Sequence, residues 1–203
     1  MKVNAPLPNA ALGALIHQSF IKASQALSIM LSRPIELRAP NVEVLSLDAL
    51  PAALSVDHEQ RAISVHGRIS GGLKGAAALV LSPQSSARLV TLLTGQPVIP
   101  TALTLSDIEV LQEVGNIVLN ACIAFLGDRL ESKIRFQQQR LDQDDLSVLL
   151  STFDGEGRQN QRAILARSEF RLEKGTVSGY FLLIVDANSL TRLRSKAKQP
   201  TTC

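Results

Sequence analysis

Two stretches in the two halves of the chain follow the same pattern. The first, KGAAALVLSPQSSARLVTLL, begins at Lys74, and the second, SGYFLLIVDANSLTRLRSKA, begins at Ser178. Their alignment matches a glycine, a leucine in an apolar run and a later Arg-Leu pair, namely Gly75 with Gly179, Leu79 with Leu183, and Arg88-Leu89 with Arg192-Leu193. Because neither half would bury its apolar face alone, the repeat predicts two copies of one unit around a shared core.

The apolar periodicity predicts the same order of elements in each copy: a long helix, extended segments, a hairpin and a short helix. The first copy is expected to contain a helix from Asn9 to about residue 32, strands over 35–38 and 42–47, a turn or short helix over 51–54, a hairpin of 62–70 and 74–81, and a helix from Ser82 to 93. The second is expected to contain a helix over 105–130, strands over 132–136 and 146–153, a loop over 154–160, a hairpin of 162–172 and 177–185, and a helix from Asp186 to 196. The fold class predicted is α+β, with two long helices packed on one mainly antiparallel sheet.

The size and composition fit a single domain. The chain has 203 residues, of which 45% are hydrophobic and 19% charged, a globular balance that can bury a core. We expect the first copy to span about residues 8–95 and the second about 105–196, with a disordered tail over 197–203.

The charge and aromatic content argue against nucleic acid as a partner. The net charge is +3, but the basic residues are scattered, and the densest group, over 192–198, is expected to be a solvated helix end. Aromatic residues make up only 3% of the chain and tryptophan is absent, so the stacking surfaces of single-strand binders are missing.

The remaining composition predicts a cytoplasmic protein without a membrane partner. No apolar run approaches the roughly 18 residues that span a bilayer, and the N-terminus lacks a signal-type apolar core. The two cysteines are Cys122, on an expected buried helix face, and Cys203, at the chain end, so they do not form a disulfide framework.

The helix expected over 105–130 has two different faces. At about 100° per residue, one face collects residues suited to burial, namely Leu111, Gly115, Val118, Cys122 and Phe125. We expect close packing at Gly115, since a glycine inside a helix costs about 1 kcal/mol relative to alanine. A capping box of Ser106 and Glu109 is expected at the start, and Gly127 is expected to end the helix.

The opposite face carries two acids and two amides without a cation: Glu109, Glu113, Asn116 and Asn120. From the residues alone, this face can be an ordinary solvated surface or a functional one. A metal site is poorly supported, because two amides without histidine suit a transition metal badly. The three histidines, His17, His58 and His66, fall on different expected elements without ligand-type spacing.

The segment EVLQEVGNIVLNAC, over 109–122, resembles the signature of the CheC, CheX and FliY family of bacterial chemotaxis phosphatases. That signature is a Glu and an Asn three residues apart on one of two long helices, with an acid or Ser before them. Here Glu113 and Asn116 match, with Val114 and Gly115 between them and Glu109 at the preceding position. The order of elements also resembles the family from about residue 8 to 196.

The resemblance implies a reaction and roles for these residues. The family hydrolyses the aspartyl phosphate of CheY-type response-regulator receivers, in which the receiver holds its own Mg²⁺, so no cofactor is expected on this chain. By resemblance, Asn116 positions the attacking water and Glu113 pairs with a lysine of the receiver. Glu109 and Asn120 would extend the contact, although Glu109 is equally expected to serve the capping box.

The first copy departs from the family pattern. Two-site members carry the same Glu and Asn on the first helix, where this chain has Ala14 and His17, although Pro40 downstream is kept. The corresponding downstream residue of the second copy is Gln139. The sequence therefore predicts one intact site and one degenerate site, with His17 as a surface histidine.

A non-enzymatic binding module is the alternative. The same fold occurs in flagellar switch proteins, which bind a phosphorylated receiver without hydrolysing it, and CheC proteins also bind the deamidase CheD. CheD and a second copy of the chain are thus further candidate partners. Retention of both Glu113 and Asn116 favours the phosphatase.

Overall fold

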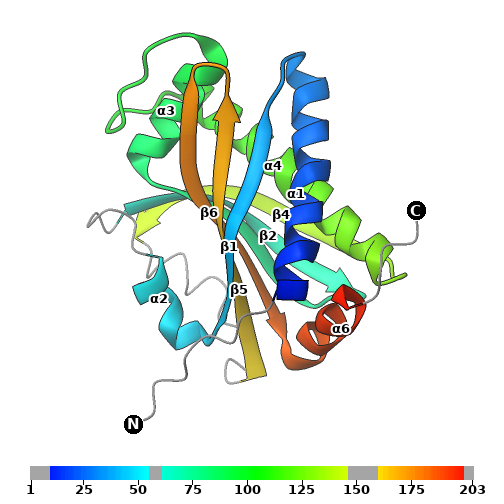
Figure 1. The fold of residues 1–203 in the computed structure, drawn as a ribbon. Coiled ribbons are helices and arrows are strands. Elements are labelled where there is room, and N and C mark those ends of the chain that lie inside the picture. Colours follow the sequence, from blue (N-terminus) through cyan, green and yellow to red (C-terminus); the bar gives the residue numbers. More distant parts are fainter. Residues whose placement is uncertain (1–9, 55–60, 146–159, 199–203) are drawn as a thin grey trace.

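A six-stranded, entirely antiparallel sheet organises the molecule (Figure 1). The computed structural model describes residues 10–54, 61–145 and 160–198. The strands are β1 (Glu36–Leu45), β2 (Arg61–Gly71), β3 (Gly75–Leu81), β4 (Ile134–Asp145), β5 (Gln161–Leu172) and β6 (Gly175–Asp186). Their order across the sheet is β1-β5-β6-β3-β2-β4, so that β1 and β4 form its two edges.

The strand order confirms the internal repeat and the α+β class. Exchanging the two copies, β1 with β4, β2 with β5 and β3 with β6, reproduces the same order read from the other edge. At the centre, Leu79 pairs with Phe181, and the equivalent pair, Ala77 with Leu183, is also formed. The edge strand of each copy pairs with a strand of the other copy: β1 of the first copy pairs with β5 of the second, and β4 of the second pairs with β2 of the first. Neither copy therefore completes the sheet without the other.

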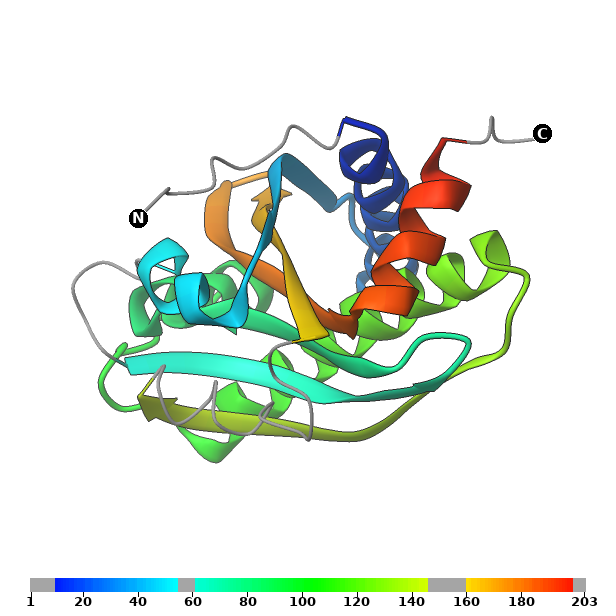
Figure 2. The same ribbon diagram turned by 90° about the horizontal axis from the view of Figure 1, so that it is seen from below.

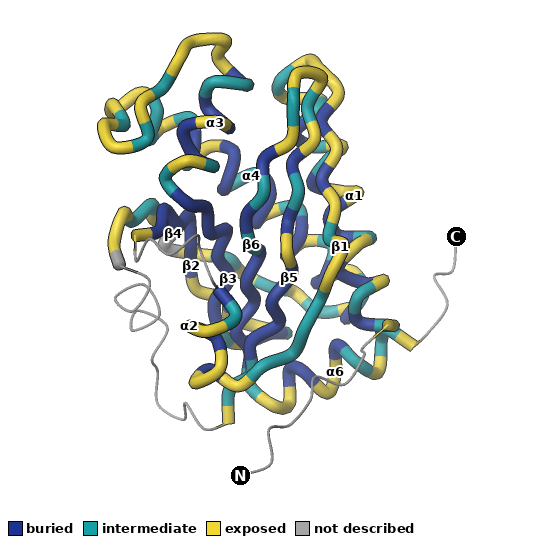
Figure 3. Tube along the Cα trace, turned by 60° about the vertical axis from the view of Figure 1, so that its left-hand side comes forward, coloured by how far each residue is buried: buried dark blue, intermediate teal, exposed yellow. Residues whose placement is uncertain are grey.

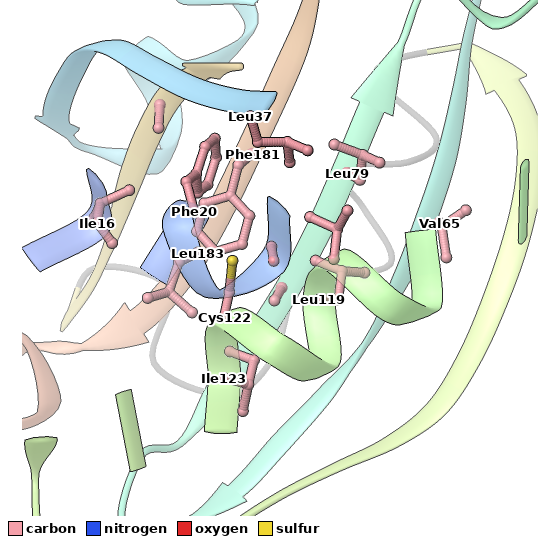
Figure 4. Packing of buried hydrophobic residues seen from close by; sticks show 14 of the residues in the cluster. Ile16, Phe20, Leu37, Val65, Leu79, Leu119, Cys122, Ile123, Phe181 and Leu183 are labelled. Atoms are coloured by element: carbon pink, nitrogen blue, oxygen red, sulfur yellow. The ribbon is translucent and has the colours of Figure 1, made fainter. Parts of the chain in front are cut away.

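Two long helices, α1 (Ala10–Leu31) and α4 (Leu105–Arg129), pack against each other and against one face of the sheet. The shorter helices α3 (Pro83–Thr94) and α6 (Ala187–Ala197) flank them, and Figure 2 shows α1, α4 and α6 side by side. Phe20 of α1 meets Phe181 of β6 edge to face, with ring centroids 5.5 Å apart. Figure 4 shows Cys122 of α4 beside this pair, fully buried as expected.

The other face of the sheet has a smaller apolar cluster. It is covered by η1 (Leu47–Ala49) and α2 (Leu50–Ala53), whose Leu47 and Leu50 pack near Ala78 and Leu182. Figure 3 shows the central strands as the most buried part of the sheet and the edge strand β1 as more exposed. Both faces of the central strands are thus covered.

The edge strands differ from the sequence expectation. The segments expected over 35–38 and 42–47 form one strand, β1, with a bulge between Arg38 and Asn41 that accommodates Pro40. The short strand expected over 132–136 is the long strand β4, which pairs with β2 over its whole length. The predicted strand over 146–153, the loop residues 154–159 and most of the predicted tail lie outside the described residues.

The hairpins and the caps of the short helices are confirmed. The hairpins are β2–β3 and β5–β6. Ser82 caps α3 by accepting the Ser85 N–H, and Asp186 caps α6 by accepting the Ser189 N–H. These side chains satisfy amide donors that a helix start leaves without partners.

The ends of α4 correct two expectations. Its capping box is formed by Thr104 and Asp107, not by Ser106 and Glu109, since the Thr104 hydroxyl accepts the Asp107 N–H and the Asp107 carboxylate accepts the Thr104 N–H. Gly127 does not end the helix but is buried within its last turn. The chain leaves the helix after Leu130, where Glu131 adopts a positive φ of 49°.

Of the described helices, α4 is the one long and apolar enough to cross a membrane by length and composition alone. Half of its apolar window is buried within the fold. A core helix passes the same test, so this property is explained by its packing on the sheet.

Candidate functional site

The polar face of α4 is the candidate site. Glu109, Glu113 and Asn120 are exposed and Asn116 is partly buried. The opposite stripe faces the core, where Leu111, Gly115, Val118 and Cys122 are buried and Phe125 is partly buried. The two faces expected for this helix are therefore confirmed, and the acids and amides follow one side of it over several turns.

A close contact next to the candidate site sets the distance between α4 and the sheet. Gly115, the residue before Asn116, lies against the side chain of Val65 on β2, without room for a side chain of its own. This contact explains why a glycine is present in the interior of a long helix, where it weakens helix formation. It also fixes how far the neighbouring Asn116 stands out from the sheet.

The amide of Asn116 makes no hydrogen bond within the described part of the chain. Its carbonyl oxygen Oδ1 is shielded from solvent yet has no partner. Most buried side-chain oxygens in proteins accept a hydrogen bond, and an exception calls for an explanation. A ligand or docked partner would therefore displace no hydrogen bond that Asn116 makes with the described residues.

The two carboxylates on this face are also uncommitted. Among the described residues, neither Glu109 nor Glu113 forms a salt bridge. No Lys or Arg lies within one turn of either residue on α4, and two like charges four residues apart on a helix repel each other. Because Thr104 and Asp107 make the capping box, Glu109 is not needed to cap the helix. The face therefore suits a cationic group from another molecule.

No family model matches the sequence. Solved structures match the fold over nearly the whole chain. FliY from Thermotoga maritima matches with a TM-score of 0.74 at 16% identity, covering 97% of this chain and 98% of that one. The chain has the fold of the CheC/CheX/FliY family.

Two further CheC-like matches have different contexts. The FliM middle domain from H. pylori matches with a TM-score of 0.62 at 11% identity, covering 93% of this chain and 97% of that one. A chain of the CheX–CheY–BeF3–Mg²⁺ complex from Borrelia burgdorferi matches with a TM-score of 0.50 at 14% identity, covering 82% and 96%. The CheC-like fold thus occurs both in a receiver-bound CheX and in FliM.

The first copy of this CheC-like domain places Ala14 and His17 on the exposed side of α1. Neither side chain is a carboxylate or an amide, so these positions lack the chemistry of Glu113 and Asn116. Their surroundings still follow the repeat: Pro40 lies in the bulge of β1, and Gln139 lies in a register shift of β4 opposite β2. The degenerate first-copy position therefore retains its backbone framework.

A row of polar side chains on β2 and β4, buried at Ser64 and His66 and partly exposed at Asp142, was not predicted from the sequence. The Ser64 hydroxyl lies 3.2 Å from Nδ1 of His66, and Nε2 of His66 lies 3.5 Å from the Asp142 carboxylate. Burial lowers the pKa of His66, although the nearby Asp142 acts in the opposite direction. Ser64 is only 1% exposed, so its hydroxyl is not accessible to a substrate as a nucleophile would be. The residues pair across two strands, and only the i, i+2 spacing of Ser64 and His66 was visible in sequence.

Nowhere among the residues that the structure describes do three His, Cys, Asp or Glu side chains come together as metal ligands would. Cys122 is not a nucleophile, because burial raises the pKa of its thiol to about 12.

An open groove of about 620 Å³ lies at the far end of the α4 polar face, lined by residues that include Ala124, Gly127, Lys133, Ile134 and Arg135. The chemistry available on α4 is thus that of carboxylates and amides.

Proposed function

We propose that this protein is a phosphatase that hydrolyses the aspartyl phosphate of a CheY-type receiver domain in chemotaxis or two-component signalling. The observation that carries the proposal is the pair Glu113 and Asn116, one helical turn apart on the exposed face of α4, with neither side chain committed within the described chain. The CheC-like fold, which is also found in a CheX–CheY complex, supports a receiver as the partner.

The reaction requires little more than placement of a water molecule. The water oxygen attacks the phosphorus, the bond from phosphorus to the aspartyl oxygen breaks, and the carboxylate leaves, so that the products are aspartate and inorganic phosphate. The Mg²⁺ that neutralises the phosphoryl oxygens belongs to the receiver, and this chain is proposed to hold no cofactor. The phosphatase therefore contributes orientation at the reacting centre.

Asn116 is the group proposed to orient the water. Its amide carries both an acceptor and two donors and does not titrate near neutral pH, so it can hold a water without exchanging a proton. Because the amide makes no hydrogen bond with the described residues, no interaction with them has to break when the receiver docks. The Gly115 contact with Val65 holds the adjoining backbone in place.

Glu113 is proposed as the docking anchor. Its exposed carboxylate forms no salt bridge with a residue that the structure describes, and a lysine from the receiver would supply a cation. Glu109 and Asn120 lie on the same face and extend the contact surface. A charged hydrogen bond of this kind is worth more than a neutral one, particularly once docking excludes water.

A non-enzymatic binding module is the second candidate, favoured by the FliM match and by the absence of carboxylate and amide groups at Ala14 and His17. Such a module would hold a phosphorylated receiver without hydrolysing it. CheD and a second copy of this chain remain proposed partners, and a cytoplasmic location, where receivers are found, is part of the same proposal.

The test measures the loss of acid-labile phosphate from purified, phosphorylated CheY-type receivers of the source organism, with and without this protein. Acceleration at substoichiometric protein supports the phosphatase. Binding of the BeF3-activated receiver without faster phosphate loss supports the binding module instead. If no receiver binds and none loses phosphate faster, both proposals are overturned.

A further inference from the structure

Two strongly exposed apolar side chains lie at the first residue of α4 and in the loop that leads into it. Leu105 is 80% exposed and Ile99 is 65% exposed, whereas the large apolar residues of the described chain are mostly buried. The other large apolar side chains that are exposed among all described residues are Ile21, Ile29 and Met30, and all three lie on α1. Exposed apolar side chains beside polar groups are found on protein-binding surfaces.

Leu105 belongs to the same face as the proposed site. At about 100° per residue, it lies about 40° around the helix from Glu109 and about 20° from Asn116. With a rise of about 1.5 Å per residue, it is about 6 Å along the axis from Glu109 and about 16 Å from Asn116. The face therefore runs from an apolar end, through two acids, to the amide.

The loop that presents Ile99 is held in place by the fold. Its backbone closes a turn, with the Ala102 N–H donating to the Ile99 carbonyl at 3.0 Å, and the Val98 N–H donates to the Thr91 hydroxyl at 3.1 Å. Val98 and Leu103 on either side pack on the main core. Figure 3 shows this segment between α3 and α4 as predominantly exposed, so Ile99 stands out from an anchored loop.

We propose that Leu105 and Ile99 form the apolar anchor of the receiver-docking surface and determine which receivers bind. This inference rests on the proposed function. The occupant it requires is a folded receiver whose surface has an apolar patch flanked by a basic side chain. The reason is that the apolar end of α4 adjoins Glu109 and Glu113, whose carboxylates form no salt bridge in the described part of the chain. Docking in this order fixes the direction of the receiver along α4 and brings its phosphoryl group to Asn116.

The anchor acts on binding and not on the chemical step. Burial of one leucine side chain at the centre of an interface is strong enough that its loss should weaken binding by about tenfold or more. Its contacts are the same before and during hydrolysis, so the loss should raise KM and leave kcat unchanged. Receivers without a matching apolar patch should show little response to the same change.

The experiment titrates the BeF3- and Mg²⁺-activated receiver into five proteins: the parent chain, Leu105→Ser, Ile99→Ser, Glu113→Gln and the control Ile29→Ser. Ile29 is as exposed as Leu105 but lies on α1, which makes the control matched in exposure and chemistry. Leu105→Ser and Ile99→Ser should each raise Kd, and Ile29→Ser should bind like the parent. With the phosphorylated receiver as substrate, both serine variants at residues 105 and 99 should retain kcat at saturation. Ile99→Ser lies outside any helix and provides the test should Leu105→Ser fold poorly.

Two results overturn the inference in different ways. If the parent binds and Glu113→Gln weakens binding while both serine variants bind like the parent, the apolar anchor is wrong and the proposed function stands. The same conclusion follows if Ile29→Ser weakens binding as much as Leu105→Ser. If the parent binds no activated receiver, the proposed function fails and the anchor fails with it.

Discussion

Gly115 of α4 and Val65 of β2 are in such close contact that a β-carbon on residue 115 would lie 2.5 Å from the β-carbon of Val65. Atoms cannot approach so closely, so any side chain at this position must push α4 away from the sheet. The displaced segment would include Asn116. Packing of the core and geometry of the proposed site are therefore coupled through one glycine.

Gly115→Ala should destabilise the protein despite the better helix propensity of alanine. The propensity gain is about 1 kcal/mol, but overpacking costs about 1–3 kcal/mol, so we expect a net loss of up to about 2 kcal/mol in the free energy of unfolding. Gly13→Ala in α1 is the control, because its nearest neighbour, the Val42 β-carbon, is 3.9 Å away. It should stabilise by about 0.5–1 kcal/mol. Urea unfolding measures the free energy of unfolding of both variants. If Gly115→Ala stabilises the protein as much as Gly13→Ala does, the close contact of Gly115 with Val65 is contradicted.

The capping box of α4 gives a second pair of variants. Thr104→Ala removes the hydroxyl that accepts the Asp107 N–H and should cost about 1 kcal/mol of unfolding free energy. Ser106→Ala, two residues later on the exposed side of the helix, should change stability by less than about 0.5 kcal/mol. Thermal and urea unfolding measure both changes. A larger loss at Ser106 than at Thr104 would restore the capping box that the sequence first indicated.

His66 should make stability dependent on pH. Burial lowers its pKa in the folded state, with Arg140 acting in the same direction and Asp142 against it. The unfolded chain then binds more protons than the folded one as pH falls through about 6.5, so the free energy of unfolding should decrease there, by less than about 1.4 kcal/mol per pH unit. His66→Asn should flatten this part of the profile. If the free energy of unfolding of the parent instead increases as the pH falls from 7.5 to 5.5, and this increase is lost in His66→Asn, the buried neutral imidazole is contradicted.

The first-copy position on α1 can be tested by adding back the missing groups. In an Asn116→Ala background, Ala14→Glu with His17→Asn should restore phosphatase activity above the rate without protein, since both positions are exposed and the equivalent bulges of β1 and β4 are kept. The readout is phosphate loss from the receiver that the parent dephosphorylates. Binding of that receiver without any gain in rate would mean that the first copy has lost more than two side chains.

Much of the architecture could be predicted from sequence because the repeat carries it. The equivalence of Leu79 with Leu183 predicted two copies of one unit, and the structure adds that the equivalent strands β3 and β6 pair with each other at the centre of the sheet. Ser82 and Asp186 were recognisable as caps because each is followed by a helix-like pattern at the same place in both copies. The two faces of α4 followed from its periodicity.

The misses have local physical reasons. At the start of α4, Thr104 with Asp107 and Ser106 with Glu109 both fit a capping pattern, and only the tertiary packing of the helix selects the first. Strand β4 is an edge strand rich in polar residues, so its apolar alternation is weak and its length is set by pairing with β2. The Ser64, His66 and Asp142 chain depends on a cross-strand register that no local pattern contains.

Asn116 is proposed to orient the attacking water while Glu113 holds the receiver. The most direct measurement is the rate of phosphate loss from one receiver over a range of receiver concentrations, for the parent, Asn116→Ala and Glu113→Gln. If Asn116 orients the water, Asn116→Ala should lower the saturated rate by about 100-fold or more with little change in receiver affinity, whereas Glu113→Gln should also weaken affinity. A saturated rate for Asn116→Ala equal to that of the parent would contradict this role of Asn116.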